Sequence, residues 1–188
     1  MNKILEFSDI SRSLINKIEK TVKQSNGIYF TPPETIKKNI EYLQPFMQNI
    51  KEVLEPSCGS CEYISQIRQE YNNINITGIE LNTDIFETIK TFQNNNTKLL
   101  NDNYITYDFK NKFDLIIGNP PYFVIKKQDV PNIYNSYYEG RPNIFILFII
   151  KSLHLLNNDG ILSFVLPKNF LNCLYYDKTR KYINENYK

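Results

Sequence analysis

Residues 113–122 read FDLIIGNPPY, and this stretch decides the fold of the chain. The apolar run 115–117 is typical of a β-strand, and it stops at Gly118. Apolar strands of this kind are buried on both faces in parallel α/β sheets. Ligands of such sheets lie beyond the carboxyl ends of the strands. We therefore expect the tetrapeptide 119–122 at the functional edge of a parallel sheet.

The tetrapeptide carries side chains that suit one kind of substrate group. Pro120 and Pro121 fix the backbone and make the loop stiff. The side-chain carbonyl of Asn119 and the backbone carbonyl of Pro120 are two acceptors for a planar amino group, and Tyr122 offers a flat face for stacking. Together they describe a clamp for an exocyclic amine on an aromatic base. The alternative is a proline-rich turn after a strand, capped by a half-buried tyrosine.

Length and composition indicate a soluble globular chain. A chain of 188 residues fits one domain with a sizeable core. The net charge of +2 neither favours nor excludes a nucleic-acid partner. The longest apolar run, 144–150, is too short to span a bilayer, so no membrane association is expected. Residues 1–6 lack the features of a signal peptide, and we expect a cytoplasmic protein.

The cysteines Cys58, Cys61 and Cys173 are odd in number, which fits a reducing compartment. Cys58 and Cys61 form a C-x-x-C pattern that invites a zinc or redox interpretation. Zinc would need two more ligands, and His154 and Cys173 are far away in sequence. We expect no metal, and interpret the pair as small residues in a tight loop.

The amino-terminal part is predicted to be helical. Apolar residues recur every four positions from Ile10 to Val22, which predicts a helix over 8–24. A second helix is expected after the segment 27–34, with Thr31 as a candidate N-cap and a proline in the first turn.

The next unit is a βαβ pattern that suits a nucleoside. A short strand, 52–55, leads into the small-residue loop 56–61 and a helix, and a second strand ends at Glu80. A carboxylate at that position grips ribose hydroxyls in doubly wound folds, although a solvated strand end is the alternative. The loop has one glycine and Glu55 at its start, which favours a ligand with a cation rather than a pyrophosphate.

Further elements complete the predicted sheet. We expect a helix over 83–93, a strand near 98–100, a buried helix over 143–156, a strand over 160–166 and a polar tail from Pro167 onward. The irregular segment 123–142 interleaves basic and aromatic residues. This pattern suits nucleic-acid contacts, and a solvated loop explains it equally well. The residues concerned are Lys126, Lys127, Tyr134, Tyr137, Tyr138 and Arg141.

With these motifs in order, the chain resembles the adenine-specific, amino-group DNA methyltransferases of restriction–modification systems, with the gamma order of motifs. The matching set covers roughly residues 25–172, and its order and spacing make it specific. Its segments are 29–34 (YFTPPE), 53–60 (VLEPSCGS), 78–81 (GIEL), 113–122 (FDLIIGNPPY) and 160–171 (GILSFVLPKNFL).

The resemblance implies an α/β, Rossmann-like S-adenosylmethionine-dependent methyltransferase fold. Its sheet would be mostly parallel with helices on both faces, and the last C-terminal strands would be missing or truncated here. Residues 1–188 would form a single catalytic domain. Its parts would be amino-terminal helices with a cofactor-contacting segment (1–48), a Rossmann-like core (49–172) and a tail (173–188).

The resemblance also implies S-adenosylmethionine as cofactor and gives roles to particular residues. Glu55 would face the ammonium and sulfonium end, and Glu80 would bind the ribose hydroxyls. The family's usual aspartate for the cofactor's adenine falls by spacing on Asn103, next to Asp102, and an amide accepts that bond more weakly. The implied cofactor residues are Tyr29, Thr31, Pro32, Glu55, Pro56, Cys58, Gly59, Glu80, Leu81, Asn103, Tyr104 and Asn119.

The catalytic residues implied by the resemblance are Asn119, Pro120, Pro121 and Tyr122. The target adenine would leave the duplex stack, and acceptors on Asn119 and Pro120 would localise the lone pair of its amino nitrogen. DNA and a cognate restriction endonuclease would be partners. The family also carries a target-recognition domain, which a longer chain or a second subunit would supply.

Two other interpretations remain open from the sequence. The same clamp can hold the amide of a protein glutamine or the amine of an RNA base. A silent or partial subunit that binds cofactor or DNA without transfer also fits these motifs.

Overall fold

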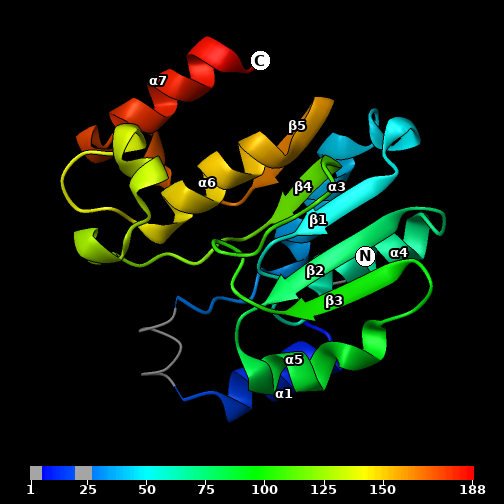
Figure 1. Cartoon of the computed structure of the whole chain (residues 1–188). Helices are drawn as coiled ribbons and strands as arrows, with labels where there is room; N and C mark the ends of the chain where they lie inside the picture. Colours follow the sequence, from blue (N-terminus) through cyan, green and yellow to red (C-terminus); the bar gives the residue numbers. More distant parts are fainter. Residues whose placement is uncertain (1–5, 20–26) are drawn as a thin grey trace.

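The computed structural model describes residues 6–19 and 27–188 (Figure 1). Within them, five parallel strands form one sheet in the order β3-β2-β1-β4-β5. This order is that of a doubly wound fold, which confirms the predicted class. The strands are β1 (Glu52–Glu55), β2 (Asn75–Glu80), β3 (Thr97–Asn101), β4 (Phe113–Gly118) and β5 (Leu156–Phe164).

Helices cover both faces of the sheet, because successive apolar residues of each strand point to opposite faces. Val53 packs into a core with α1, α3, α4 and α5, and its neighbour Leu54 packs into a second core with α6. Figure 1 shows α6 and α7 on the side of the sheet away from α5. The helices are α1 (Asp9–Lys17), α3 (Pro33–Leu43), α4 (Glu62–Glu70), α5 (Thr83–Ile89), α6 (Ile144–Leu155) and α7 (Asp177–Asn186).

Short 3-10 helices fill the connections. They are η1 (Met47–Asn49), η2 (Lys90–Phe92), η3 (Lys127–Asp129), η4 (Asn132–Tyr137), η5 (Lys168–Leu171) and η6 (Leu174–Tyr176). No helix in the described ranges is long and apolar enough to cross a membrane.

Two predictions for the amino-terminal part were wrong. The helix predicted over 8–24 ends at Lys17, because Ile18 has an extended backbone, and the predicted apolar position Val22 lies outside the described residues. Thr31 is not the N-cap of α3: Pro32 holds that position, and no side chain caps the helix.

The strand β5 begins four residues before its predicted start at Gly160. Between Phe113 and Leu115 of β4 the pairing register shifts, and Asp159 has a left-handed backbone with φ 61°. A β-carbon on Gly160 would lie 2.9 Å from the carbonyl oxygen of Asn157, so the irregularity needs glycine there. A turn-like sequence therefore sits inside a strand.

The segments predicted as an irregular loop and a polar tail pack against each other. Tyr134 and Tyr138 are buried in the second core, so they are not free to stack on bases. The tail forms α7, whose Thr179 donates a hydrogen bond to the Tyr137 carbonyl at 2.6 Å. Lys126 stays exposed, which fits both a solvated loop and a nucleic-acid contact.

Candidate functional site

The carboxyl ends of the parallel strands meet at one edge of the sheet, and a large cavity of about 690 Å³ lies there. Its volume is that of a typical small-molecule site. Glu80 at the end of β2 and Asn119 just after β4 both line it. The segment 102–106 after β3 forms another wall.

Glu80 joins the end of β2 to the loop that follows β1. Its carboxylate accepts hydrogen bonds from the backbone N–H of Gly59 at 2.9 Å and of Asn82 at 2.8 Å. Burial raises the pKa of Glu80, and these two bonds act in the opposite direction. A carboxylate has about four lone-pair sites, so Glu80 can still accept from hydroxyl groups in the cavity.

A second, small cavity of about 30 Å³ adjoins the first, because both are lined by Tyr29, Gly59 and Asn119. Glu55 lines the small cavity and is only 3% exposed. Its oxygen Oε2 is buried without a hydrogen-bond partner among the described residues.

The environment of Glu55 favours a cationic ligand. Burial raises the pKa of this carboxyl well above its usual range, and the neighbouring Cys61 and Glu80 raise it further. An ionised carboxylate without a partner is costly in such a place. A ligand cation in the small cavity would supply the missing partner, so the residues present fit the ammonium group of S-adenosylmethionine.

Asn119 lies between the two cavities and is held from several sides. The backbone of Gly118 lies against Glu55, since a β-carbon there would lie 3.5 Å from Glu55 Cγ. Ser57 donates to the backbone carbonyl of Asn119 at 3.1 Å. The Asn119 amide nitrogen donates to the Tyr29 carbonyl at 3.4 Å.

Tyr122 is half-buried, and its hydroxyl is already engaged. The hydroxyl donates to Asn119 Oδ1 and to the carbonyl of Val165, which follows β5. Burial raises the pKa of Tyr122, so the group stays protonated. Its ring stacks with Tyr29, with 6.3 Å between the ring centres, and meets the edge of Phe145 at 6.1 Å.

The residues predicted near the cofactor's adenine line the large cavity but differ in availability. Asn103 Oδ1 accepts from the N–H of Ile105 at 2.9 Å, and Asp102 accepts from the N–H of Asn103 at 2.7 Å. Tyr104 is 2% exposed, and its hydroxyl bonds to Ser152 at 2.8 Å. The Tyr104 ring therefore supports the cavity from the core.

Most of the residues singled out in the sequence come together here, and a few do not. Pro32 is exposed and lines neither cavity, and Pro120 and Tyr122 lie beside the cavities without lining them. The predicted residues on the large cavity are Tyr29, Pro56, Gly59, Glu80, Leu81, Asn103, Tyr104, Asn119 and Pro121. Those on the small cavity are Tyr29, Thr31, Glu55, Cys58, Gly59 and Asn119.

Sequence reasoning missed several lining residues. Ile28, Phe30 and Phe123 line the large cavity, and their position next to the two proline motifs was the available signal. Ser60 and Glu62 line the small cavity; Ser60 lies in the small-residue loop after β1 but was given no role, and no local pattern marked Glu62.

The fold is the Rossmann-like fold found in S-adenosylmethionine-dependent methyltransferases. A protein of Listeria monocytogenes, assigned to the class I S-adenosylmethionine-dependent methyltransferases, superposes with a TM-score of 0.75 at 17% identity. The match covers 94% of this chain and 56% of that one. At this identity the similarity establishes the fold.

The chain belongs to the Eco57I restriction-modification methylase family, whose profile matches residues 12–188. It is 32% identical over 183 residues to the modification methylase CviBIII of Paramecium bursaria Chlorella virus NC1A, covering 95% of this chain and 47% of that protein. It is 34% identical over 178 residues to the type II methyltransferase M.CvrRI of Paramecium bursaria Chlorella virus XZ-6E, covering 92% and 44%.

These matches confirm the predicted membership among the methyltransferases of restriction–modification systems. Family and fold together support S-adenosylmethionine as the cofactor. The chain spans somewhat less than half the length of these two relatives.

Proposed function

We propose that this chain is the catalytic part of a DNA methyltransferase that transfers a methyl group from S-adenosylmethionine to the exocyclic amino group of adenine. Residues 1–188 would act as one cytoplasmic domain. The cofactor supplies an electrophilic methyl group bound to a sulfonium. The partners we propose are DNA, a target-recognition part outside this sequence and a cognate restriction endonuclease.

The chain's own residues would hold the cofactor in two places. Glu55, whose buried oxygen lacks a partner, would bind the ammonium end in the small cavity next to Thr31. Glu80 would accept from the ribose hydroxyls, with Leu81 and Asn103 beside the adenine ring.

The same edge would hold the target base once it has left the duplex stack. Asn119 Oδ1 and the Pro120 carbonyl would accept hydrogen bonds from the two N–H groups of the adenine amine. These bonds would localise the lone pair on the amine nitrogen. Two prolines keep the backbone of this loop stiff, so most of the rate acceleration would come from positioning and oriented dipoles. The Tyr122 ring would support the base.

The observation that carries this proposal is the place of Asn119. It lines both cavities, beside Glu80 in the large one and Glu55 in the small one. An amine held at Asn119 would therefore lie next to a sulfonium bound between those two carboxylates. This juxtaposition is what methyl transfer in line with the breaking bond requires.

The test is the substitution Asn119→Ala in the full-length protein. We expect methyl transfer to DNA to fall at least about a hundredfold, the size of effect seen when one oriented acceptor or donor is lost. Affinity for S-adenosylmethionine, measured by calorimetry, should stay within several-fold. Asn95→Ala, in an exposed turn, is the matched control. Equal loss of transfer and cofactor affinity would contradict the assigned role.

The substrate class has its own experiment. Labelled S-adenosylmethionine is offered with DNA, RNA and protein, and the labelled base is then identified. We expect N6-methyladenine in DNA. Label in a glutamine side chain or an RNA base would replace the proposal by the corresponding alternative, and tight cofactor binding without transfer would indicate a silent subunit.

A further inference from the structure

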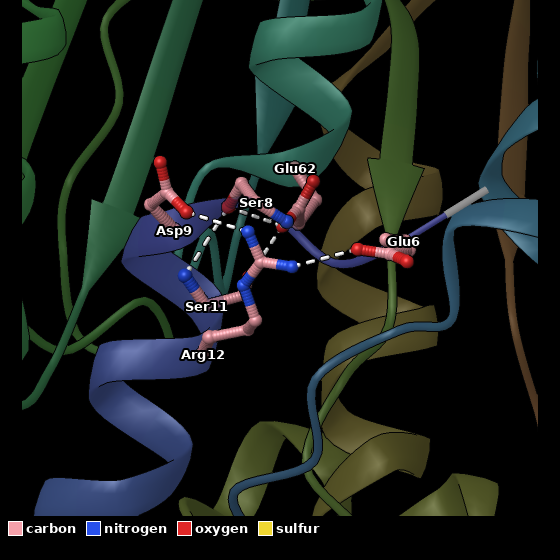
Figure 2. Close-up of polar contacts among 6 residues, drawn as sticks. All are labelled: Glu6, Ser8, Asp9, Ser11, Arg12 and Glu62. Atoms are coloured by element: carbon pink, nitrogen blue, oxygen red, sulfur yellow. Dashed lines mark hydrogen bonds and ion pairs between the residues drawn. The ribbon is translucent and has the colours of Figure 1, made fainter.

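Helix α1 is joined to the loop after β1 by a cluster of four residues, Ser8, Ser11, Ser60 and Glu62, here called the serine–Glu62 cluster. Glu62 Oε1 accepts from the backbone N–H of Ser8 at 3.1 Å and from its hydroxyl at 2.6 Å. The Ser11 hydroxyl bonds to the same carboxylate oxygen and, at 2.6 Å, to the hydroxyl of Ser60. Figure 2 shows Ser8, Ser11 and Glu62 facing one another.

The cluster is partly buried, with Ser8 and Glu62 half-buried, and it ties the beginnings of two helices together. Ser11 is 0% exposed and Ser60 is 4% exposed. Ser8 caps α1 through a bond from the Ser11 N–H at 3.1 Å, and Glu62 is the first residue of α4. A carboxylate is stabilised where the positive ends of two helices meet. Buried hydroxyls that are all bonded make such a junction rigid.

Two members of the cluster also form part of the site. Ser60 and Glu62 line the small cavity together with Glu55. The residues that fix this wall are therefore Ser8 and Ser11, which lie about fifty positions earlier in the chain and line neither cavity.

We propose that Ser8, Ser11 and Glu62 are positioning residues through which the docking of α1 sets the wall of the small cavity, so that α1 docking and binding of the cationic amino-acid end of S-adenosylmethionine are coupled. This inference rests on the proposed cofactor site. Coupling is reciprocal: the cofactor would hold α1 in place to the same extent as α1 improves cofactor binding.

The same helix offers a control on its exposed side. Arg12 pairs with Glu6 at 2.9 Å and with Asp9 at 2.6 Å, and the Arg12 side chain is 51% exposed (Figure 2). These pairs join α1 to itself and to the residues just before it, and they do not reach the loop after β1. Exposed ion pairs of this kind contribute little to the stability of the folded chain.

The first experiment is calorimetry of the 188-residue chain with S-adenosylmethionine. We expect Ser11→Ala and Glu62→Ala to weaken affinity about tenfold, since each removes hydrogen bonds to a charged group. Glu62→Gln keeps an acceptor oxygen for Ser8 and Ser11 but loses the charge, so it should weaken affinity less than Glu62→Ala does. Arg12→Ala should leave the affinity unchanged.

The second experiment measures hydrogen exchange of the α1 amides with and without S-adenosylmethionine. We expect the cofactor to increase protection of α1 in the unsubstituted chain and in Arg12→Ala, and to add little in Ser11→Ala. A residue with a purely structural role would lower protection equally with and without cofactor, and that result would overturn the coupling.

The outcomes separate this inference from the proposed function. Unaltered affinity in Ser11→Ala would overturn the coupling and leave the cofactor site standing. Absence of binding by the unsubstituted chain would overturn both. If Ser11→Ala does not fold, Ser60→Ala removes the same hydroxyl bond from the cavity side. An unaltered affinity in that folded variant would overturn the coupling as well.

Discussion

At the scale of single residues, the hydroxyl of Tyr122 occupies the acceptor that the proposed amine clamp needs. The same hydroxyl has a second acceptor, which explains how Asn119 would become available. Asn119 Oδ1, the acceptor proposed for the adenine amine, already accepts from this hydroxyl. The carbonyl of Val165 offers the same hydrogen a second acceptor. An incoming amine can therefore take Asn119 while Tyr122 turns its hydrogen wholly to Val165, and no buried group loses its partner.

This exchange gives a prediction about two substitutions of Tyr122 in the full-length protein. Tyr122→Phe frees Asn119 and keeps the ring, so methyl transfer should stay within several-fold of the original rate. Tyr122→Ala removes the ring, and transfer should fall about tenfold or more because stacking on a base is lost. Cofactor affinity should change little in both. A larger defect in Tyr122→Phe than in Tyr122→Ala would mean that the hydroxyl, and not the ring, serves the reaction.

At the scale of elements, helix α6 holds the loop that forms one wall of the large cavity. Lys151 donates to the carbonyls of Ile105 at 3.0 Å and Tyr107 at 2.6 Å, and its ammonium lies 5.1 Å from the centre of the Tyr104 ring. The next residue, Ser152, bonds to the Tyr104 hydroxyl. Two successive helix residues thus fix the segment that faces the ligand.

We therefore expect Lys151→Met to weaken S-adenosylmethionine binding several-fold and to destabilise the chain by about 1 kcal/mol, the typical net worth of such hydrogen bonds. Thermal unfolding and calorimetry measure the two effects. Lys110→Met is the control, because Lys110 makes an exposed ion pair with Asp108 near the same loop. If both variants bind the cofactor like the original chain, α6 does not position this wall.

The sequence predicted correctly those elements whose structure is determined by neighbouring residues in the chain. The buried strands and the loop after β1 follow from apolar runs and small residues, and they bring Glu55, Glu80 and Asn119 to one edge. Prediction failed where the structure depends on residues that are distant in sequence. Gly160 looks like the start of a strand, but it lies within one, because the irregularity depends on the neighbouring strand β4.

The same limit applies to the site. Contact between Ser11 and Ser60 joins residues 49 positions apart, and nothing in the motif that contains Ser60 points to Ser11. Pro32 shows the opposite case: its motif is specific, yet the residue is exposed, occupies the N-cap position of α3 and lines neither cavity. A motif fixes where the backbone goes more reliably than which of its side chains faces the ligand.

At the scale of the whole molecule, a parallel sheet gathers carboxylates at one edge, and this has a cost in stability. Burial raises the pKa of both Glu55 and Glu80 above the ordinary value of 4.5. Between that value and the raised one, the native chain binds more protons than the unfolded chain. Its free energy of unfolding therefore falls as the pH rises through this window.

We predict that Glu55→Gln reduces this fall in the free energy of unfolding with rising pH. The same substitution should weaken cofactor binding, so the two effects of Glu55 can be measured separately. Without cofactor, the variant should unfold about 2–4 °C higher than the original chain near pH 8, which corresponds to about 1 kcal/mol in a domain of this size. Near pH 5, where Glu55 is more protonated, the difference should shrink. Glu70→Gln, at the exposed end of α4, is the control.

With S-adenosylmethionine bound, the original chain should unfold at a higher temperature than Glu55→Gln near pH 8. A cation beside Glu55 favours its ionised form, so the stabilisation that the cofactor gives the original chain should grow from pH 5 to pH 8. Glu55→Gln should gain less from the cofactor at pH 8. Thermal unfolding across this pH range, with and without the cofactor, measures both effects. If the cofactor raises the unfolding temperature equally in the two chains at every pH, the cation does not lie at Glu55.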